Sequence, residues 1–335
     1  MSSEQPPSSG ELATAEILAA ASVTDRPLAV EPVQSGHTVF RLRTERHVYF
    51  LKTHSKDLEE FADHAAGAAQ LVRREAAAYG CLRAHGIPAV EVVAAESSCD
   101  NPVGWPYLLT LELPGISLRD VVESEHPAWW AAVEAFGRYL AAAHAIRFPR
   151  AGYLTSAEGP ASDGSSLAQE VSHRAEVVLP DALRDLERAR PHLSHELAAE
   201  VERRLADLPR AIAGEYVEPR FVHGNSHINH PHLLIEGERP RFTGQLDMDG
   251  ASAGAPFEDL HTVTWGMMAH APRLAWWEPL FAGYGSVPDL DRFRLALLSA
   301  CFYCFGDRNE VSLESLYRRL LTATTWHQLF TAHLS

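Results

Sequence analysis

Hydrophobic and polar positions alternate with a period of two in two neighbouring runs, residues 37–44 (HTVFRLRT) and 47–53 (HVYFLKT). This period is typical of half-buried β-strands, and Glu45 and Arg46 between the runs fit a tight turn. The pattern therefore predicts a β-hairpin. Similar runs predict strands at 90–96 and 106–113, and apolar residues at helical spacing predict helices over residues 11–22 and 57–85.

The pattern changes after Pro114 and Gly115. Helical periodicity dominates residues 117–147, most of 166–213 and the chain from about 257 onward, with a short strand at 219–222 and a hairpin at 232–236 and 242–246. This order predicts an α+β fold, with a small β-rich N-lobe before a larger helical C-lobe. We divide the chain into an N-terminal tail and short helix (1–30), an N-lobe (31–113) and a C-lobe (114–335).

Composition narrows the class of partner. The chain has 335 residues, of which 46% are hydrophobic, and a formal net charge of -15. Such a charge repels nucleic acids and anionic membranes and favours cationic partners. The alternative is that the acidic charge only keeps the protein soluble. No apolar run of about 18 residues and no secretion signal is evident. We expect a cytoplasmic protein that binds neither nucleic acid nor membrane.

Four features that suit phosphoryl transfer occur in order along the chain. Ser35 and Gly36 form a turn whose backbone N–H groups can approach phosphate. Lys52 ends the next strand, Glu75 lies on the following helix, and Asp247 comes after a late strand. A strand lysine can hold phosphates, a helix glutamate can orient that lysine, and an aspartate can bind Mg²⁺. Each residue alone is weak evidence, and the hypothesis rests on their order.

Three segments carry a resemblance to a known family. Residues 221–260, FVHGNSHINHPHLLIEGERPRFTGQLDMDGASAGAPFEDL, resemble the block of the aminoglycoside phosphotransferase and choline kinase superfamily that runs from H-G-D through I-D to P-x-x-D-L. Residues 138–146 (RYLAAAHAI) and 107–115 (YLLTLELPG) are similar to its large-lobe helix and its hinge. The resemblance implies a bilobal, protein-kinase-like fold and ATP and Mg²⁺ as cofactors.

The resemblance also implies roles for individual residues. Lys52 would contact the α- and β-phosphates, Glu75 would orient Lys52, Asp247 would bind magnesium, and Asp259 would brace the catalytic loop. Ser35 and Gly36 would approach the phosphates. Backbone groups of the hinge would hold the adenine, and these belong to Thr110, Leu111, Glu112 and Leu113.

The catalytic loop departs from the family pattern. Asn225 stands where the family has its catalytic aspartate, and an amide cannot accept a proton as a carboxylate does. His227 is an alternative base, because an ordinary imidazole has a pKa near about 6.5. The second metal ligand aligns with His230 by counting or with His232 after an insertion, and Asn229 is a third candidate. Asp249, two residues after Asp247, is a candidate for a second carboxylate ligand of magnesium.

Three functions follow from this pattern. The first is transfer of the ATP γ-phosphate to a hydroxyl of a natural product, an antibiotic or a peptide Ser/Thr, in antibiotic resistance or biosynthesis. The second is a nucleotide-binding pseudokinase that serves a biosynthetic pathway as a partner protein. The third uses the same fold for other chemistry, with the loop histidines as acid and base groups. A separate alternative is that the clustered His223, His227, His230 and His232 bind a transition metal. Asn225 leaves open whether the chain is an enzyme.

Overall fold

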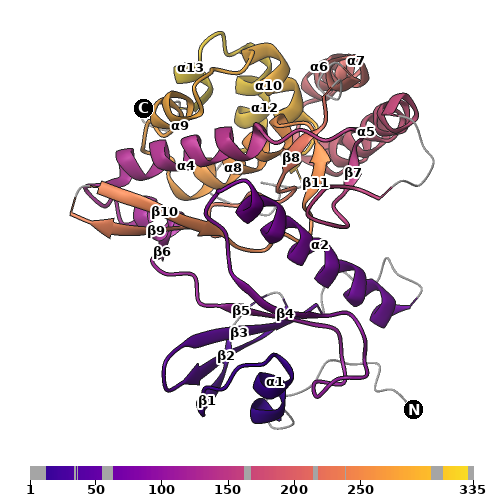
Figure 1. The fold of residues 1–335 in the computed structure, drawn as a ribbon. Coiled ribbons are helices and arrows are strands. Elements are labelled where there is room, and N and C mark those ends of the chain that lie inside the picture. Colours follow the sequence, from indigo (N-terminus) through magenta and orange to yellow (C-terminus); the bar gives the residue numbers. More distant parts are fainter. Residues whose placement is uncertain are drawn as a thin grey trace. The chain divides into compact units, whose positions relative to one another are not determined.

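The chain forms two compact units in a computed structural model that describes residues 13–33, 35, 37–54, 63–161, 167–213, 218–237, 239–302 and 312–330 (Figure 1). The first unit contains residues 1–115 and two later segments, Tyr153–Ala161 and Thr243–Ser252. The second contains the remainder: Ile116–Gly152, Ser162–Phe242 and Ala253–Ser335. The first unit therefore contains the predicted site residues Lys52 and Glu75 from the early part of the chain, and Asp247 and Asp249 from the late part.

The first unit is built on an antiparallel sheet of five strands in the order β1-β2-β3-β5-β4. The predicted hairpin is confirmed, with Thr38 opposite Thr53. The inward positions of its strands, such as Leu42 and Leu51, are completely buried. The strands are β1 (Pro27–Val33), β2 (Thr38–Thr44), β3 (Val48–Thr53), β4 (Val92–Glu96) and β5 (Tyr107–Leu111).

Strand β1 was missed by the sequence analysis because it contains Pro27 and Pro32. Proline cannot donate to a strand ladder and is tolerated mainly on edge strands. Strand β1 does occupy an edge of the sheet formed by the described residues, next to β2. The two prolines therefore obscured the strand in the sequence pattern, although they are compatible with an edge strand.

Two helices complete the first unit, α1 (Thr14–Ala20) and α2 (His64–Ala84). Helix α2 packs against β4 and β5. It begins after Asp63, whose carboxylate accepts the N–H groups of Ala65 and Ala66. It ends where Gly86 takes the left-handed conformation with φ of 70°. Residues 57–62 of the predicted helix lie outside the described residues, and the described helix begins at His64.

The second unit is mainly helical. The predicted helix over 117–147 is two helices, because Glu125 adopts a φ of 48° and Pro127 follows. The helices are α3 (Leu118–Glu123), α4 (Trp129–His144), α5 (Leu167–Ala189), η2 (Arg190–His192), α6 (His195–Leu205), α7 (Leu208–Ala213), α8 (Phe257–His270), α9 (Trp277–Tyr284), α10 (Leu290–Leu298), α12 (Leu313–Thr322) and α13 (Trp326–Phe330).

Short strands accompany these helices, and the late part of the chain contains the predicted hairpin. Strand β9 lies between β10 and β6, and Ile116 pairs with Leu233. The strands are β6 (Ile116–Ser117), β7 (Gly152–Tyr153), β8 (Arg220–Val222), β9 (Pro231–Glu236), β10 (Arg239–Gln245) and β11 (Ser252–Gly254). An antiparallel sheet followed by a mainly helical region confirms the predicted α+β class.

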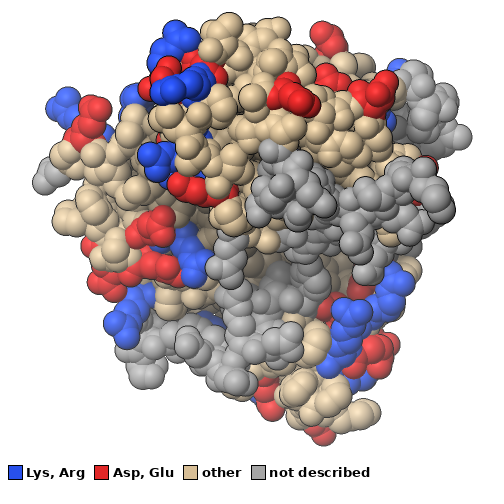
Figure 2. All heavy atoms as spheres, turned by 90° about the horizontal axis from the view of Figure 1, so that it is seen from below, with Lys and Arg blue, Asp and Glu red and all other residues tan. Residues whose placement is uncertain are grey.

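Acidic and basic side chains lie beside one another on the face shown in Figure 2. Exposed pairs such as Arg43 with Glu31, 3.5 Å apart, contribute at most about 1 kcal/mol each. Across the described residues, the helices are all too short or too polar to cross a membrane.

Helices α4 and α9 approach one another closely through two glycines. A Cβ atom built on Gly137 would overlap the carbonyl oxygen of Leu280, and one built on Gly283 would overlap the carbonyl oxygen of Glu134. The backbones therefore meet where neither residue has a side chain. This close contact fixes the position of α4, which carries His144 at its last turn.

Replacing Gly283 by alanine is therefore expected to lower the free energy of unfolding by roughly 1–3 kcal/mol, the usual cost of overpacking. Gly80 in α2 supplies a matched control, because its Cβ would lie 3.6 Å from the Cβ of Ala157, an ordinary contact. Gly80→Ala is expected to be neutral or slightly stabilising. Thermal unfolding of the two variants checks this, and an unchanged Tm for Gly283→Ala would contradict the close helix contact.

Candidate functional site

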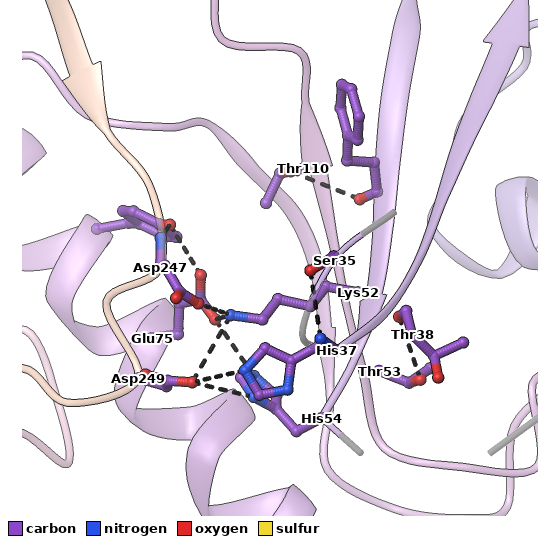
Figure 3. A network of polar contacts seen from close by, with 12 residues as sticks. Ser35, His37, Thr38, Lys52, Thr53, His54, Glu75, Thr110, Asp247 and Asp249 are labelled. Carbon is purple, nitrogen blue, oxygen red and sulfur yellow. Dashed lines mark hydrogen bonds and ion pairs between the residues drawn. The ribbon is translucent and has the colours of Figure 1, made fainter. Parts of the chain in front are cut away.

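A buried ion pair joins strand β3 to helix α2 in the first unit. The Nζ atom of Lys52 lies 2.9 Å from Oε2 of Glu75 (Figure 3). Only 13% of the Lys52 side chain and 3% of the Glu75 side chain are exposed. Lys52 lies on the half-buried face of β3, opposite to the buried Leu51, and Glu75 lies on the buried face of α2. The sheet and its helix therefore hold the two charges together away from water.

Asp247, which follows β10, completes this arrangement. Its carboxylate also accepts a hydrogen bond from Lys52, and its backbone adopts a φ of 62°. The left-handed region is tolerated by aspartate better than by most residues. The backbone N–H of Asp247 donates to the Tyr79 hydroxyl at 3.1 Å, and that hydroxyl donates to Oε1 of Glu75 at 2.8 Å. Tyr79 thus fixes the aspartate and the glutamate relative to one another.

The charged groups strongly shift one another's pKa values. Burial lowers the pKa of Lys52, but the carboxylates of Glu75, Asp247 and Asp249 outweigh it and raise that pKa above its usual range. Burial likewise raises the pKa of Glu75, while Lys52 and His54 lower it, to about 2 overall. Lys52 therefore carries its positive charge and Glu75 its negative charge at neutral pH.

Two histidines that the sequence analysis did not select lie in the same network. Oδ2 of Asp249 is 3.4 Å from Nε2 of His37, 3.4 Å from Nδ1 of His54 and 3.7 Å from Nζ of Lys52. His54 is completely buried, and its Nε2 lies 3.2 Å from Oε2 of Glu75. Burial and Lys52 lower the pKa of His54, whereas Asp249 and Glu75 outweigh them and raise it.

The hairpin register could have identified both histidines. A two-residue turn at Glu45 and Arg46 pairs Thr38 with Thr53, so one step further along the strands brings His37 opposite His54. His54 also lies two residues after Lys52, and alternate residues of a strand share a face. The rings of His37 and His54 are indeed neighbours, with centroids 5.0 Å apart.

The carboxylates near Lys52 suit a hard divalent cation. One oxygen each from Glu75, Asp247 and Asp249 lies within 4.8 Å of the other two. Magnesium prefers oxygen ligands and is usually held by one or two carboxylates together with substrate phosphates. Asp247 and Asp249 would hold Mg²⁺ here, because Glu75 already pairs with Lys52. The donor set therefore fits the cofactor implied by the sequence.

The other residues predicted to bind nucleotide have structural contacts of their own. Oγ of Ser35 accepts the backbone N–H of His37 at 3.2 Å, and Gly36 lies outside the described residues. The N–H groups of Leu111 and Glu112 donate to the carbonyls of Glu91 and Val48 within the sheet.

The remaining hinge residues can be placed as well. Thr110 donates to the Phe50 carbonyl at 3.5 Å, and Leu113 packs over Gly244. The predicted hinge is thus the end of strand β5 and the residues that follow it.

The predicted catalytic loop lies in the second unit, where Asp259 organises its start. Oδ2 of Asp259 accepts the backbone N–H of His223 at 2.8 Å, and Oδ1 accepts that of Gly224 at 3.0 Å. His144 of α4 also contacts Oδ2, at 3.1 Å through Nε2. Asp259 is 1% exposed, so this buried carboxylate fixes two successive residues just before Asn225.

The loop histidines contact the backbone of their own loop. Nδ1 of His230 lies 3.0 Å from the Asn225 carbonyl, and Nδ1 of His232 lies 3.0 Å from the His230 carbonyl. Burial lowers the pKa of His232. The backbone N–H of His227 donates to the Asn225 carbonyl at 2.7 Å, and that of Asn229 lies 3.4 Å from Nδ1 of His227.

These contacts do not gather the histidines into a metal centre. Within the part of the chain that the structure describes, no cluster of three metal-binding side chains includes one of these loop histidines. The two such clusters that are found belong to the first unit.

Comparison with known proteins identifies the family. A family model described as the phosphotransferase enzyme family matches residues 29–296, well over half of the 335 residues. The chain therefore belongs to this phosphotransferase family, as its motifs predicted. No curated protein sequence is a significant match.

Solved structures show the same fold. The aminoglycoside phosphotransferase APH(3'')-Id from Streptomyces rimosus matches with a TM-score of 0.51 and 20% identity, over 86% of this chain and 96% of that chain. The GDP and kanamycin complex of APH(2")-IIIa matches with a TM-score of 0.55 and 17% identity, over 92% and 96% of the two chains. At these identities the matches concern the fold, and they confirm the protein-kinase-like class.

Tyr79→Phe is expected to lower the free energy of unfolding by about 1–3 kcal/mol, because it removes the hydroxyl that donates to the buried Glu75 carboxylate and accepts the N–H of Asp247. Tyr107→Phe is the matched control in the same unit. The Tyr107 hydroxyl is buried and has no hydrogen-bond partner among the described residues, so its removal is expected to be neutral or stabilising. Chemical denaturation of both variants provides the measurement, and equal losses would show that the Tyr79 link contributes nothing.

Proposed function

We propose that this chain is a phosphotransferase that moves the γ-phosphate of ATP to a hydroxyl group of a small natural product, an antibiotic or a peptide Ser/Thr. The observation that supports it best is the buried Lys52, held between Glu75 and Asp247. Phosphoryl transfer requires positioning and charge neutralisation more than covalent help from the protein. Lys52 offers a fixed cation for phosphate oxygens, and Asp247 offers a carboxylate for the metal ion.

Each remaining residue has a defined part in this proposal. Glu75 and Tyr79 keep Lys52 and Asp247 at fixed positions. Mg²⁺ held by Asp247 and Asp249 would neutralise charge on the phosphates. In the second unit, Asp259 fixes the loop that presents Asn225. The Asn225 amide would hydrogen-bond the acceptor hydroxyl and orient it, which supports catalysis when the transition state is loose.

The structural relatives bear on the substrates. The APH(2")-IIIa structure contains GDP and kanamycin, a nucleotide and an aminoglycoside. This supports a nucleotide and a small cationic acceptor for the present chain, in agreement with its net charge of -15. Because that complex contains a guanine nucleotide, GTP should be tested beside ATP as the phosphate donor of the present chain.

Asn225 favours a second candidate function. Loss of a general base typically reduces a rate by roughly 10²–10⁴. A chain that keeps Lys52, Glu75 and Asp247 but has an amide at position 225 could bind nucleotide without turning it over. The second candidate is therefore a nucleotide-binding pseudokinase that acts through its partners.

Nucleotide binding can be tested by thermal unfolding. ATP or GTP with Mg²⁺ is expected to raise the Tm, because a ligand at 100 times its Kd adds about 2.7 kcal/mol to the free energy of unfolding. Lys52→Met should abolish or strongly weaken this shift. Arg43→Met removes one positive charge from the neighbouring strand β2, where Arg43 forms an exposed ion pair with Glu31, and should keep the shift. The absence of any shift in the native protein would exclude both candidate functions.

Catalytic competence can be tested separately through Asn225→Asp. Restoring a carboxylate is expected to raise the rate of phosphate release or transfer by about 10²–10⁴, the usual contribution of a general base. Gln328→Glu makes the same amide-to-carboxylate change at an exposed position of α13, outside the candidate site, and should leave the rate unchanged. If the native protein and Asn225→Asp both bind nucleotide but neither hydrolyses or transfers it, the chain is a pseudokinase.

A further inference from the structure

We propose that His37, His54 and Asp249 form a binding site for a borderline divalent transition metal such as Zn²⁺, which shares Asp249 with the magnesium site proposed above. One ligand atom from each of the three lies within 4.8 Å of the other two. All three residues belong to the first unit, so the site is complete within it. Figure 3 shows both imidazole rings directed at the Asp249 carboxylate.

The distances between the ligand atoms fit a tetrahedral metal. Zinc bonds of about 2.0–2.1 Å to nitrogen and oxygen place neighbouring ligand atoms about 3.3–3.4 Å apart in a tetrahedron. Oδ2 of Asp249 lies 3.4 Å from Nε2 of His37 and 3.4 Å from Nδ1 of His54. Both separations exceed the length of a good N–H···O hydrogen bond, which is roughly 2.7–3.2 Å. The described residues accordingly offer neither His54 nitrogen a partner with hydrogen-bond geometry.

The surroundings of His54 also match a metal ligand. An imidazole that binds a metal through one nitrogen usually directs its other nitrogen to a carboxylate or carbonyl, which fixes the ring. Nε2 of His54 lies 3.2 Å from Oε2 of Glu75. His54 is completely buried, and the His37 side chain is 9% exposed. A buried imidazole with both nitrogens facing carboxylates is therefore placed as in a carboxylate–histidine–metal triad.

Charge balance favours a cation at this place. Glu75, Asp247 and Asp249 supply three negative charges, and Lys52 supplies one positive charge. A divalent cation balances the remaining two. Two imidazole nitrogens select Zn²⁺ and similar ions over Mg²⁺, which prefers oxygen ligands.

The decisive experiment is metal binding by the full-length protein without nucleotide, so its outcome is independent of phosphotransferase activity. The metal-free protein is titrated with Zn²⁺ against a chromophoric chelator, and with Co²⁺ while its visible absorption is followed. One equivalent of Zn²⁺ should bind tightly in excess Mg²⁺, and Co²⁺ should show a tetrahedral spectrum. His37→Gln and His54→Gln should each weaken Zn²⁺ binding by at least about 10-fold, the lower bound for losing even an outer-shell partner.

Two control variants locate the site. His47→Gln alters a histidine at the other end of the same hairpin, whose Nδ1 lies 2.7 Å from Oδ2 of Asp25, and should bind Zn²⁺ as the native protein does. His230→Gln tests the loop histidines of the second unit and should also bind normally. Should His54→Gln fail to fold, as judged by circular dichroism, His37→Gln and its Co²⁺ spectrum decide.

Three results would overturn the proposal. These are the absence of tight Zn²⁺ binding in the native protein, displacement of Zn²⁺ by Mg²⁺, and loss of binding in His230→Gln but not in His37→Gln. The first would mean that the two histidines and Asp249 contact one another without a metal ion.

Discussion

The first unit depends on a lysine ammonium group that is held away from water by acidic side chains. Lys52 comes from the sheet, Glu75 from the helix packed on it, and Asp247 from a segment almost 200 residues later, since the hydrogen bond spans a sequence separation of 195. A buried ion requires partners at short range, because desolvation of one charge costs several kcal/mol. The lysine therefore fixes where three distant parts of the chain must meet.

Such a cluster is a constraint on structure more than a source of stability. Replacing a buried ion pair by apolar residues is often neutral or stabilising, whereas removing one partner is costly. Stability alone therefore does not account for these charges, and the hydroxyl of Tyr79 adds further hydrogen bonds that keep Glu75 and Asp247 in place.

The sequence predicted the periodic parts of the fold well. The hairpin of β2 and β3 and the helical character of the second unit follow from local hydrophobic patterns, which need no tertiary information. Strand β1 could not be found this way because its prolines conceal an edge strand. The break after α3 was missed because Glu125 adopts a positive φ, and glutamate is not a residue type that favours this conformation.

Sequence reasoning about the site was limited by contacts between distant segments. The residues chosen from motifs include four that the structure brings together, namely Lys52, Glu75, Asp247 and Asp249. His37 and His54 were overlooked because neither belongs to a motif. Their pairing follows only from the register of two strands, and their approach to Asp249 requires the tertiary fold. The roles of the hinge and of the second-unit loop rest on resemblance.

The hairpin between β2 and β3 sets unequal tolerance to insertions along its length. Adding one residue inside β3 would turn the side chains beyond that point to the opposite face, because neighbouring residues of a strand alternate. Lys52 and His54 would both leave their partners. Extra residues between Glu45 and Arg46 would lengthen an exposed turn, and the contacts of this turn with Asp25 and Arg26 do not involve the charged cluster around Lys52. The turn is therefore the place in this hairpin where a peptide tag or fluorescent reporter can be inserted without moving the charged cluster.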